Sequence, residues 1–84
     1  MKVEYDKETD TLTITLRDAR VKESDEVRAG VIADFGYDGA VVGFEILDAS
    51  TRTQNPMAME FAVAGEGNSK PTLVREKPGR KYGK

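Results

Sequence analysis

The sequence predicts a mainly β protein, on the border with α+β, made of antiparallel hairpins with a short helical turn after the main sheet. Apolar and polar residues alternate with a period of two in several segments, as in strands with one buried face. Turn-forming residues such as Asp38-Gly39 separate these segments. The chain has 84 residues, which suits one domain with a modest core.

The first hairpin is predicted from residues 3–5 and 11–16, in which apolar and polar side chains alternate. Residues 7–10 between them are polar and suit the turn. If Tyr5 lies opposite Leu12, every apolar side chain of the hairpin reaches the same face.

The pair Asp38-Gly39 lies between two apolar runs and predicts the second hairpin, with a two-residue type I′ turn. The register puts three apolar pairs on the face that we expect to be the core: Phe35–Val42, Ala33–Phe44 and Val31–Ile46. The opposite face of this hairpin is mixed, because Ile32, Val41 and Leu47 stand beside polar residues there, and we expect another part of the protein or a second copy to cover part of it.

Residues 18–30 are highly charged, and we expect a loop with a short edge strand there. After the second hairpin, Asp48 and Ser50 are suitable N-caps for a short helical turn. Residues 57–64 alternate as a strand does, although the flanking Pro56 and Gly65 also suit a two-turn helix. The strand is the preferred alternative.

The end of the chain is predicted to be a flexible basic tail, residues 65–84, that follows a β-rich domain of residues 1–64. The tail has six Lys or Arg against two Asp or Glu, whereas the domain has seven against 13. Weak, non-specific nucleic-acid binding is therefore one hypothesis, although the acidic domain disfavours it. Within the tail, residues 72–74 could form an edge strand. The basic candidates are Lys70, Arg75, Lys77, Arg80 and Lys81.

The chain contains no Cys and no His. Disulfides, zinc sites of the usual kind, Cys nucleophiles and Ser-His or Cys-His dyads are therefore excluded. We expect no cofactor. The first residues form no apolar signal segment, and no apolar run is long enough to cross a membrane, so we expect a cytoplasmic protein.

Three carboxylates are the candidates for chemistry: Asp34, Glu45 and Asp48. The predicted register places Asp34 and Glu45 diagonally on one face beside Gly43, within reach of a shared metal or metabolite or of acid-base work. The same residues also fit a structural role. Gly43 then marks a bulge or a close contact, and Glu45 pairs with an arginine such as Arg17, Arg20 or Arg28.

Residues 1–52 resemble the prokaryotic family catalogued as domain of unknown function 2283, on the combination of Tyr5-Asp6, Asp10-Thr11-Leu12, Asp34-Phe35, Asp38-Gly39 and residues 45–50. The resemblance implies a small β-meander that self-associates, and it carries no established activity. It also implies a small protein partner, because some relatives are encoded beside toxin-like proteins, which suggests an antitoxin-like role. Residues 53–84 lie outside the resemblance.

We therefore expect a protein-protein interaction module that forms a homodimer. The predicted interface is the mixed face with Ile32, Val41 and Leu47, and the basic tail is expected to become ordered on a partner. Folding back of residues 57–63 onto that face is the alternative cover. An enzyme that uses Asp34, Glu45 and Asp48 is the less favoured alternative.

Overall fold

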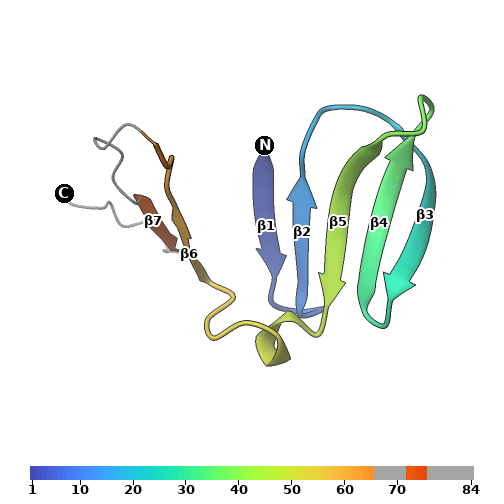
Figure 1. The fold of residues 1–84 in the computed structure, drawn as a ribbon. Helices are drawn as coiled ribbons and strands as arrows, with labels where there is room; N and C mark the ends of the chain where they lie inside the picture. The colour runs from blue at the N-terminus through green and yellow to red at the C-terminus, as the bar shows by residue number, and fades with distance from the viewer. Residues whose placement is uncertain (66–71, 76–84) are drawn as a thin grey trace. The chain divides into compact units, whose positions relative to one another are not determined.

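The computed structural model describes residues 1–65 and 72–75, the latter by their backbone alone. The chain divides into two compact units, Met1–Gln54 and Asn55–Lys84, and each is described by itself. The first holds a five-stranded antiparallel sheet and the second a two-stranded sheet (Figure 1). The predicted β class is confirmed. The described residues contain no helix with the length and apolar character needed to cross a membrane.

The strands of the first unit lie in the order β1-β2-β5-β4-β3, so β1 and β3 are the edges. A hairpin of β1 and β2 is joined to a meander of β3, β4 and β5 by the pairing of β2 with β5. The connection from β2 to β3 crosses the ends of β5 and β4 (Figure 1). The bounds are β1 Lys2–Asp6, β2 Thr11–Thr15, β3 Val21–Arg28, β4 Val31–Gly36 and β5 Val41–Leu47, followed by the 3-10 turn η1 Ala49–Thr51.

The register of the first hairpin agrees with the prediction. Tyr5 lies opposite Leu12 and Val3 lies opposite Ile14, so the apolar side chains of both strands share one face. The polar turn between the strands ends at Asp10, which has a positive φ of 56°.

The second hairpin agrees with the prediction over residues 31–34 and differs at its turn. The loop has three residues rather than two, because the Gly36 N–H donates to the Ala40 carbonyl (2.9 Å) and the Gly39 N–H donates to the Gly36 carbonyl (3.0 Å). Gly39 alone has the positive φ (83°) that closes such a loop with a bulge. Val42 is then an extra residue of β5 with no directly opposite residue in β4, and Phe35 lies opposite Val41 rather than opposite Val42 as predicted.

The charged segment before β4 forms a longer strand than expected. β3 has eight residues, all of them exposed, where the sequence predicted a loop and a short edge strand. Its pairing with β4 is irregular at two places, between Val21 and Glu23 and between Glu26 and Arg28. Charges and bulges of this kind protect an edge strand from pairing with other chains.

The two hairpins meet where Gly43 of β5 lies opposite Thr15 of β2. A Cβ atom at Gly43 would lie 2.3 Å from the carbonyl oxygen of Ile14, closer than such atoms approach. Glycine is therefore required for the backbones of β2 and β5 to come this close. The predicted close-contact role of Gly43 is confirmed.

Pleating gives the sheet two different faces. One, the apolar face, carries residues that lie opposite one another across four strands: Val3, Tyr5, Leu12, Ile14, Val31, Ala33, Phe35, Phe44 and Ile46. The other, the polar face, carries Lys2, Glu4, Asp6, Thr11, Thr13, Thr15, Ser24, Glu26, Ile32, Asp34, Gly43, Glu45 and Leu47.

The five-stranded sheet has a small core. Ala33, Val42 and Ala49 are the buried apolar residues among those described, and no large side chain there is fully buried. The large residues of the apolar face are half-buried, apart from Val3, which is 38% exposed. Within the described part of Met1–Gln54 the sheet is a single layer, because its other element is the three-residue turn η1.

The turn η1 follows β5 as predicted, but Asp48 does not cap it with its side chain. Asp10 does so from the first hairpin. Its carbonyl oxygen accepts the Ala49 N–H (2.9 Å), and its carboxylate accepts the N–H (2.9 Å) and the hydroxyl (2.7 Å) of Ser50. The Tyr5 hydroxyl donates to the same carboxylate (2.6 Å). Asp10 thereby ties the end of β5 to the first hairpin.

The second unit pairs β6, Ala58–Phe61, with β7, Thr72–Arg75. Residues 57–64 therefore contain the preferred strand and not the alternative helix. β7 includes the predicted edge strand at residues 72–74 and lies in the segment predicted to be a tail. Apart from Gly65, the remainder of that segment lies outside the described residues.

Replacing Gly43 by Ala should destabilise the protein by about 2 to 3 kcal/mol, because the added methyl group meets the backbone of β2, which cannot move aside as a side chain can. Urea unfolding followed by circular dichroism measures this change. Gly36→Ala is the matched control, since its methyl group would meet the side chains of Arg17, Val42 and Asp38 at 3.1 to 3.3 Å. Equal losses of stability in the two variants would contradict the assigned role of Gly43.

Candidate functional site

Asp34 lies on β4 at the polar face, and only 8% of the residue is exposed. Ser24 of β3 lies directly opposite, and its hydroxyl donates a hydrogen bond of 2.5 Å to Oδ1 of Asp34. A hydroxyl donor offsets part of the cost of burying a carboxylate. Strand pairing thus places a buried acidic side chain and its hydrogen-bond donor on the same face of the sheet.

Glu45 is the diagonal neighbour of Asp34, because Asp34 lies opposite Gly43 and Ile32 lies opposite Glu45. The hydrogen bond between the two carboxyl groups raises the pKa of Glu45, and burial and the negative charge of Asp34 raise it further. Two carboxyl groups in contact hold one proton between them more readily than both ionise. The structure therefore brings together two of the three predicted carboxylates as diagonal neighbours on the polar face.

Asp48 does not join this pair. It begins η1 with a positive φ of 54°, and its carbonyl oxygen accepts the Thr51 N–H (3.0 Å) and the Thr51 hydroxyl (2.8 Å). Five residues of extended chain, roughly 16 Å, separate it from Gly43, the residue opposite Asp34. Within residues 1–65 and 72–75, no group of three Asp or Glu side chains is placed to hold a metal ion.

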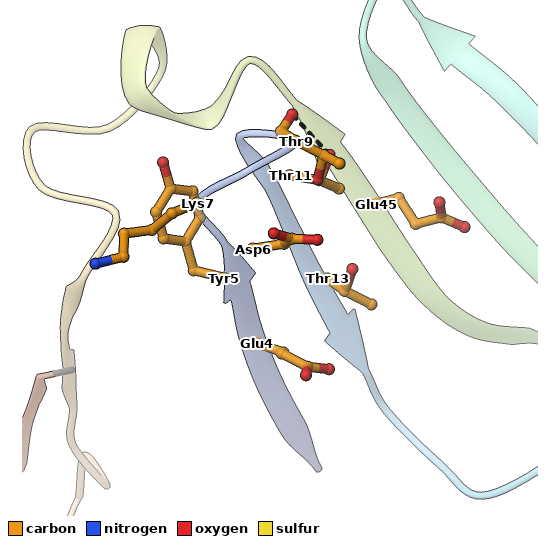
Figure 2. A pocket seen from close by; sticks show the side chains of 8 residues that line it. All are labelled: Glu4, Tyr5, Asp6, Lys7, Thr9, Thr11, Thr13 and Glu45. Atoms are coloured by element: carbon orange, nitrogen blue, oxygen red, sulfur yellow. Dashed lines mark hydrogen bonds between the residues drawn. The ribbon is translucent and has the colours of Figure 1, made fainter. Parts of the chain in front are cut away.

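A shallow groove of about 600 Å³ lies on the polar face beside Glu45 (Figure 2). It is formed by β1, β2, the turn between them and β5. Three carboxylates and three threonines line it, so it offers mainly hydrogen-bond acceptors and hydroxyl groups. The lining residues are Glu4, Tyr5, Asp6, Lys7, Thr9, Thr11, Thr13 and Glu45.

These groups restrict the chemistry that the face can perform. Asp34 and Glu45 are neighbouring carboxyl groups, and the groove presents acceptors to a cationic or hydrogen-bonding group, but neither arrangement contains a nucleophile activated by a base. Use of Asp34, Glu45 and Asp48 as an enzyme site or a metabolite site stays a prediction. The structure places Asp34 and Glu45 side by side, and Asp48 lies apart from them.

The three residues of the predicted interface do not share one face. Ile32 and Leu47 lie on the polar face, opposite Glu45 and Thr11 respectively. Val41 lies opposite Phe35, which places it on the apolar side, because the extra residue Val42 interrupts the alternation of β5. A two-residue turn would have kept Val41 in step with Leu47.

The arginines that were expected to pair with Glu45 have other partners. Arg17 forms a bidentate pair with Asp38 at 2.8 and 3.0 Å, and this interaction holds the pKa of Asp38 at about 2. Arg20 lies 5.2 Å from the centre of the Tyr37 ring, and Arg28 donates to the carbonyl of Val27. The expectation of an arginine partner for Glu45 was therefore wrong.

Sequence reasoning missed the two side chains that organise the ends of the sheet. Arg17 also donates to the carbonyls of Ala40 and Val41 (both 3.1 Å), which anchors the turn of the second hairpin. Arg52 donates to the carbonyls of Leu47 (2.8 Å) and Ala29 (3.1 Å) beside the turn before β4. No local motif marks either residue, because all but one of their partners lie more than 20 positions away in the sequence.

Of the basic residues named in the predicted tail, Arg75 lies within the described part of the chain. Arg75 ends β7, where its backbone pairs with that of Ala58. The other predicted tail residues lie outside the described range: Lys70, Lys77, Arg80 and Lys81.

The first unit matches a family model over residues 2–50, more than half of the chain. The family is described as Protein of unknown function (DUF2283). The chain belongs to this family. The resemblance seen in the sequence is confirmed over nearly the same residues, and the match ends within η1. No curated protein and no solved structure matches this DUF2283 protein. Its cytoplasmic location stays a prediction.

The carboxyl pair predicts how the stability of this DUF2283 protein depends on pH. Because the pKa of folded Glu45 is raised above its ordinary value of 4.5, the contribution of the pair is fully present below pH 4.5 and is lost as the pH rises through the raised value. Glu45→Gln should remove this loss, so the free-energy difference between variant and wild type should change across the same pH range.

Urea unfolding at a series of pH values from 4 to 8 measures this difference. Glu8→Gln is the control, because Glu8 lies in the exposed turn of the first hairpin. A Glu45→Gln profile parallel to those of wild type and Glu8→Gln would show that the two carboxyl groups do not share a proton.

Proposed function

We propose that this chain is a protein-protein interaction module that forms a homodimer through the apolar face of its five-stranded sheet. The observation that carries the proposal is the missing second layer. Large side chains such as Leu12, Ile14 and Phe44 gather on one face, and none of them is fully buried. Stable domains bury such a face against another layer.

A second copy of the sheet is the simplest layer to supply. The four strands that carry the apolar face, each of about six residues, span roughly 19 by 20 Å, or about 380 Å² before the relief of the side chains is counted. This flat area is about half of the roughly 800 Å² per partner of a standard stable interface, and the relief of the side chains adds to it. Two sheets packed face to face form a sandwich, and a two-fold axis is the commonest way to pair identical chains.

The proposal assigns the interface to the apolar face rather than to the predicted residues Ile32, Val41 and Leu47. The structure separates those three residues between the two faces, and the polar face that holds Ile32 and Leu47 also holds the carboxyl pair. Burying those carboxyl groups in an interface would cost more than burying the apolar face.

A different cover is available within the chain, because the second unit contains apolar side chains of its own. Phe61 is 45% exposed and Val63 is 59% exposed. The alternative cover expected from the sequence, residues 57–63, belongs to this unit, and the test below distinguishes it from a second copy. A neutralising role toward a small protein partner stays a prediction.

Leu12→Lys should convert the wild-type dimer into a monomer at about 20 µM, because it places a charge in the middle of the apolar face. Thr13→Lys is the matched control, since it adds the same charge at the next residue of β2, on the polar face. Sedimentation velocity measures the mass of each variant, and circular dichroism checks that the β structure is retained.

A dimer for wild type and for Thr13→Lys, with a monomer for Leu12→Lys, is the expected result. A wild-type monomer at this concentration would contradict the homodimer and favour cover by the Asn55–Lys84 unit.

A further inference from the structure

The two edges of the five-stranded sheet differ in their readiness to accept another strand. β3 pairs irregularly with β4 at two places, and such bulges obstruct the addition of a strand. β1 pairs with β2 without any irregularity over Lys2 to Asp6. Among the described strands, β1 has β2 as its one neighbour, so its other side presents a regular row of backbone donors and acceptors.

The side chains of β1 alternate between charge and apolar character. Lys2, Glu4 and Asp6 point to the polar face, and Val3 and Tyr5 point to the apolar face. Within one chain, Nζ of Lys2 lies 3.7 Å from Oε1 of Glu4. Both charged groups are well exposed, with side-chain exposures of 70% and 66%, so they are accessible to a neighbouring strand.

We propose that β1 pairs antiparallel with β1 of a second copy, with Val3 on the two-fold axis. In this register Lys2 of each copy lies opposite Glu4 of the other, which makes two cross-strand pairs of opposite charge. Met1 lies opposite Tyr5, so apolar residues also meet apolar residues. The edge is distinct from the apolar face of the homodimer proposed above and does not depend on it.

The direction and the charge of the side chains exclude the neighbouring registers of the β1–β1 pairing. A shift by one residue is not possible, because directly opposed residues must point to the same face. With Lys2 or Glu4 on the axis, identical charges oppose each other, and with Tyr5 on the axis Glu4 opposes Asp6. The register centred on Val3 is the one that pairs every charged residue between positions 2 and 4 with its opposite.

Pairing at this edge would continue the sheet from one copy into the next. The strand has five residues, so the contact is expected to be weaker than burial of the apolar face. Combined with a face-to-face homodimer, it would join two dimers side by side. It therefore predicts association at high concentration, beyond the mass of the dimer.

Site-directed disulfide formation tests this register directly, because the chain has no cysteine of its own. In the full chain carrying Val3→Cys, the two sulfur atoms would face each other across the axis, at the Cα separation of about 5.5 Å that a disulfide needs. Packing of two sheets face to face cannot produce the same bond, since it separates the backbones by about 10 Å. Val27→Cys is the matched control, because Val27 is an exposed valine on the other edge strand.

Mild oxidation at several hundred µM should give a disulfide-linked dimer with Val3→Cys at least about tenfold faster than with Val27→Cys. Equal rates for the two variants would overturn the proposal. Failure of the face-to-face homodimer would not affect this measurement, because the linked species can form from monomers.

A mixing experiment tests the charge pairing. Adding Lys2→Glu to Val3→Cys gives each chain two carboxylates on β1, and adding Glu4→Lys gives each chain two ammonium groups. Either variant alone should form its linked dimer about tenfold more slowly, whereas a mixture should form the mixed dimer at the rate of the parent. Mixed and pure dimers are separated by mass spectrometry. An ion pair within one chain cannot restore the rate on mixing, so a mixed dimer as slow as the pure ones would contradict the proposed register.

Discussion

The pairing of β2 with β5 is the constraint on which the sheet depends. The β1–β2 hairpin and the β3–β5 meander are local structures, and this pairing turns them into one sheet with a continuous apolar face. Gly43 permits it, because any side chain there would meet the backbone of Ile14. Asp10 secures the same junction from the other end of β5 by binding Ser50, and the hydrogen bonds from Tyr5 and then from Ser50 lower the pKa of its carboxyl group.

The two faces of the assembled sheet differ in whether their side chains have partners within Met1–Gln54. The polar face satisfies its buried carboxyl group, since the Ser24 hydroxyl donates to Asp34, and threonines line the groove beside Glu45. The apolar face has no partner within Met1–Gln54. A small chain without disulfides gains stability from burying such a face, and this need supports an interaction role more strongly than any arrangement of catalytic groups does.

The sequence predicted the features that depend on local alternation. The opposition of Tyr5 and Leu12 follows from period-two patterning, and the diagonal placement of Asp34 and Glu45 follows from the register set by the hairpin. The extra residue Val42 was not predictable, because Asp38-Gly39 suits both a two-residue turn and the three-residue loop that forms. The roles of Asp10 and Arg17 depend on partners 40 and 21 positions away, and no local pattern indicates such partners.

The central claim is that a second copy covers the apolar face, and isotope-filtered nuclear Overhauser spectroscopy tests it most directly. Equal amounts of ¹³C-labelled and unlabelled chain are mixed, and only contacts between different chains are recorded. We expect contacts from the methyl groups of Leu12, Ile14 and Ile46 to the aromatic ring of Phe44 in the other copy. Intermolecular signals absent from these methyl groups, with contacts to residues of Asn55–Lys84 of the same chain in their place, would contradict the claim.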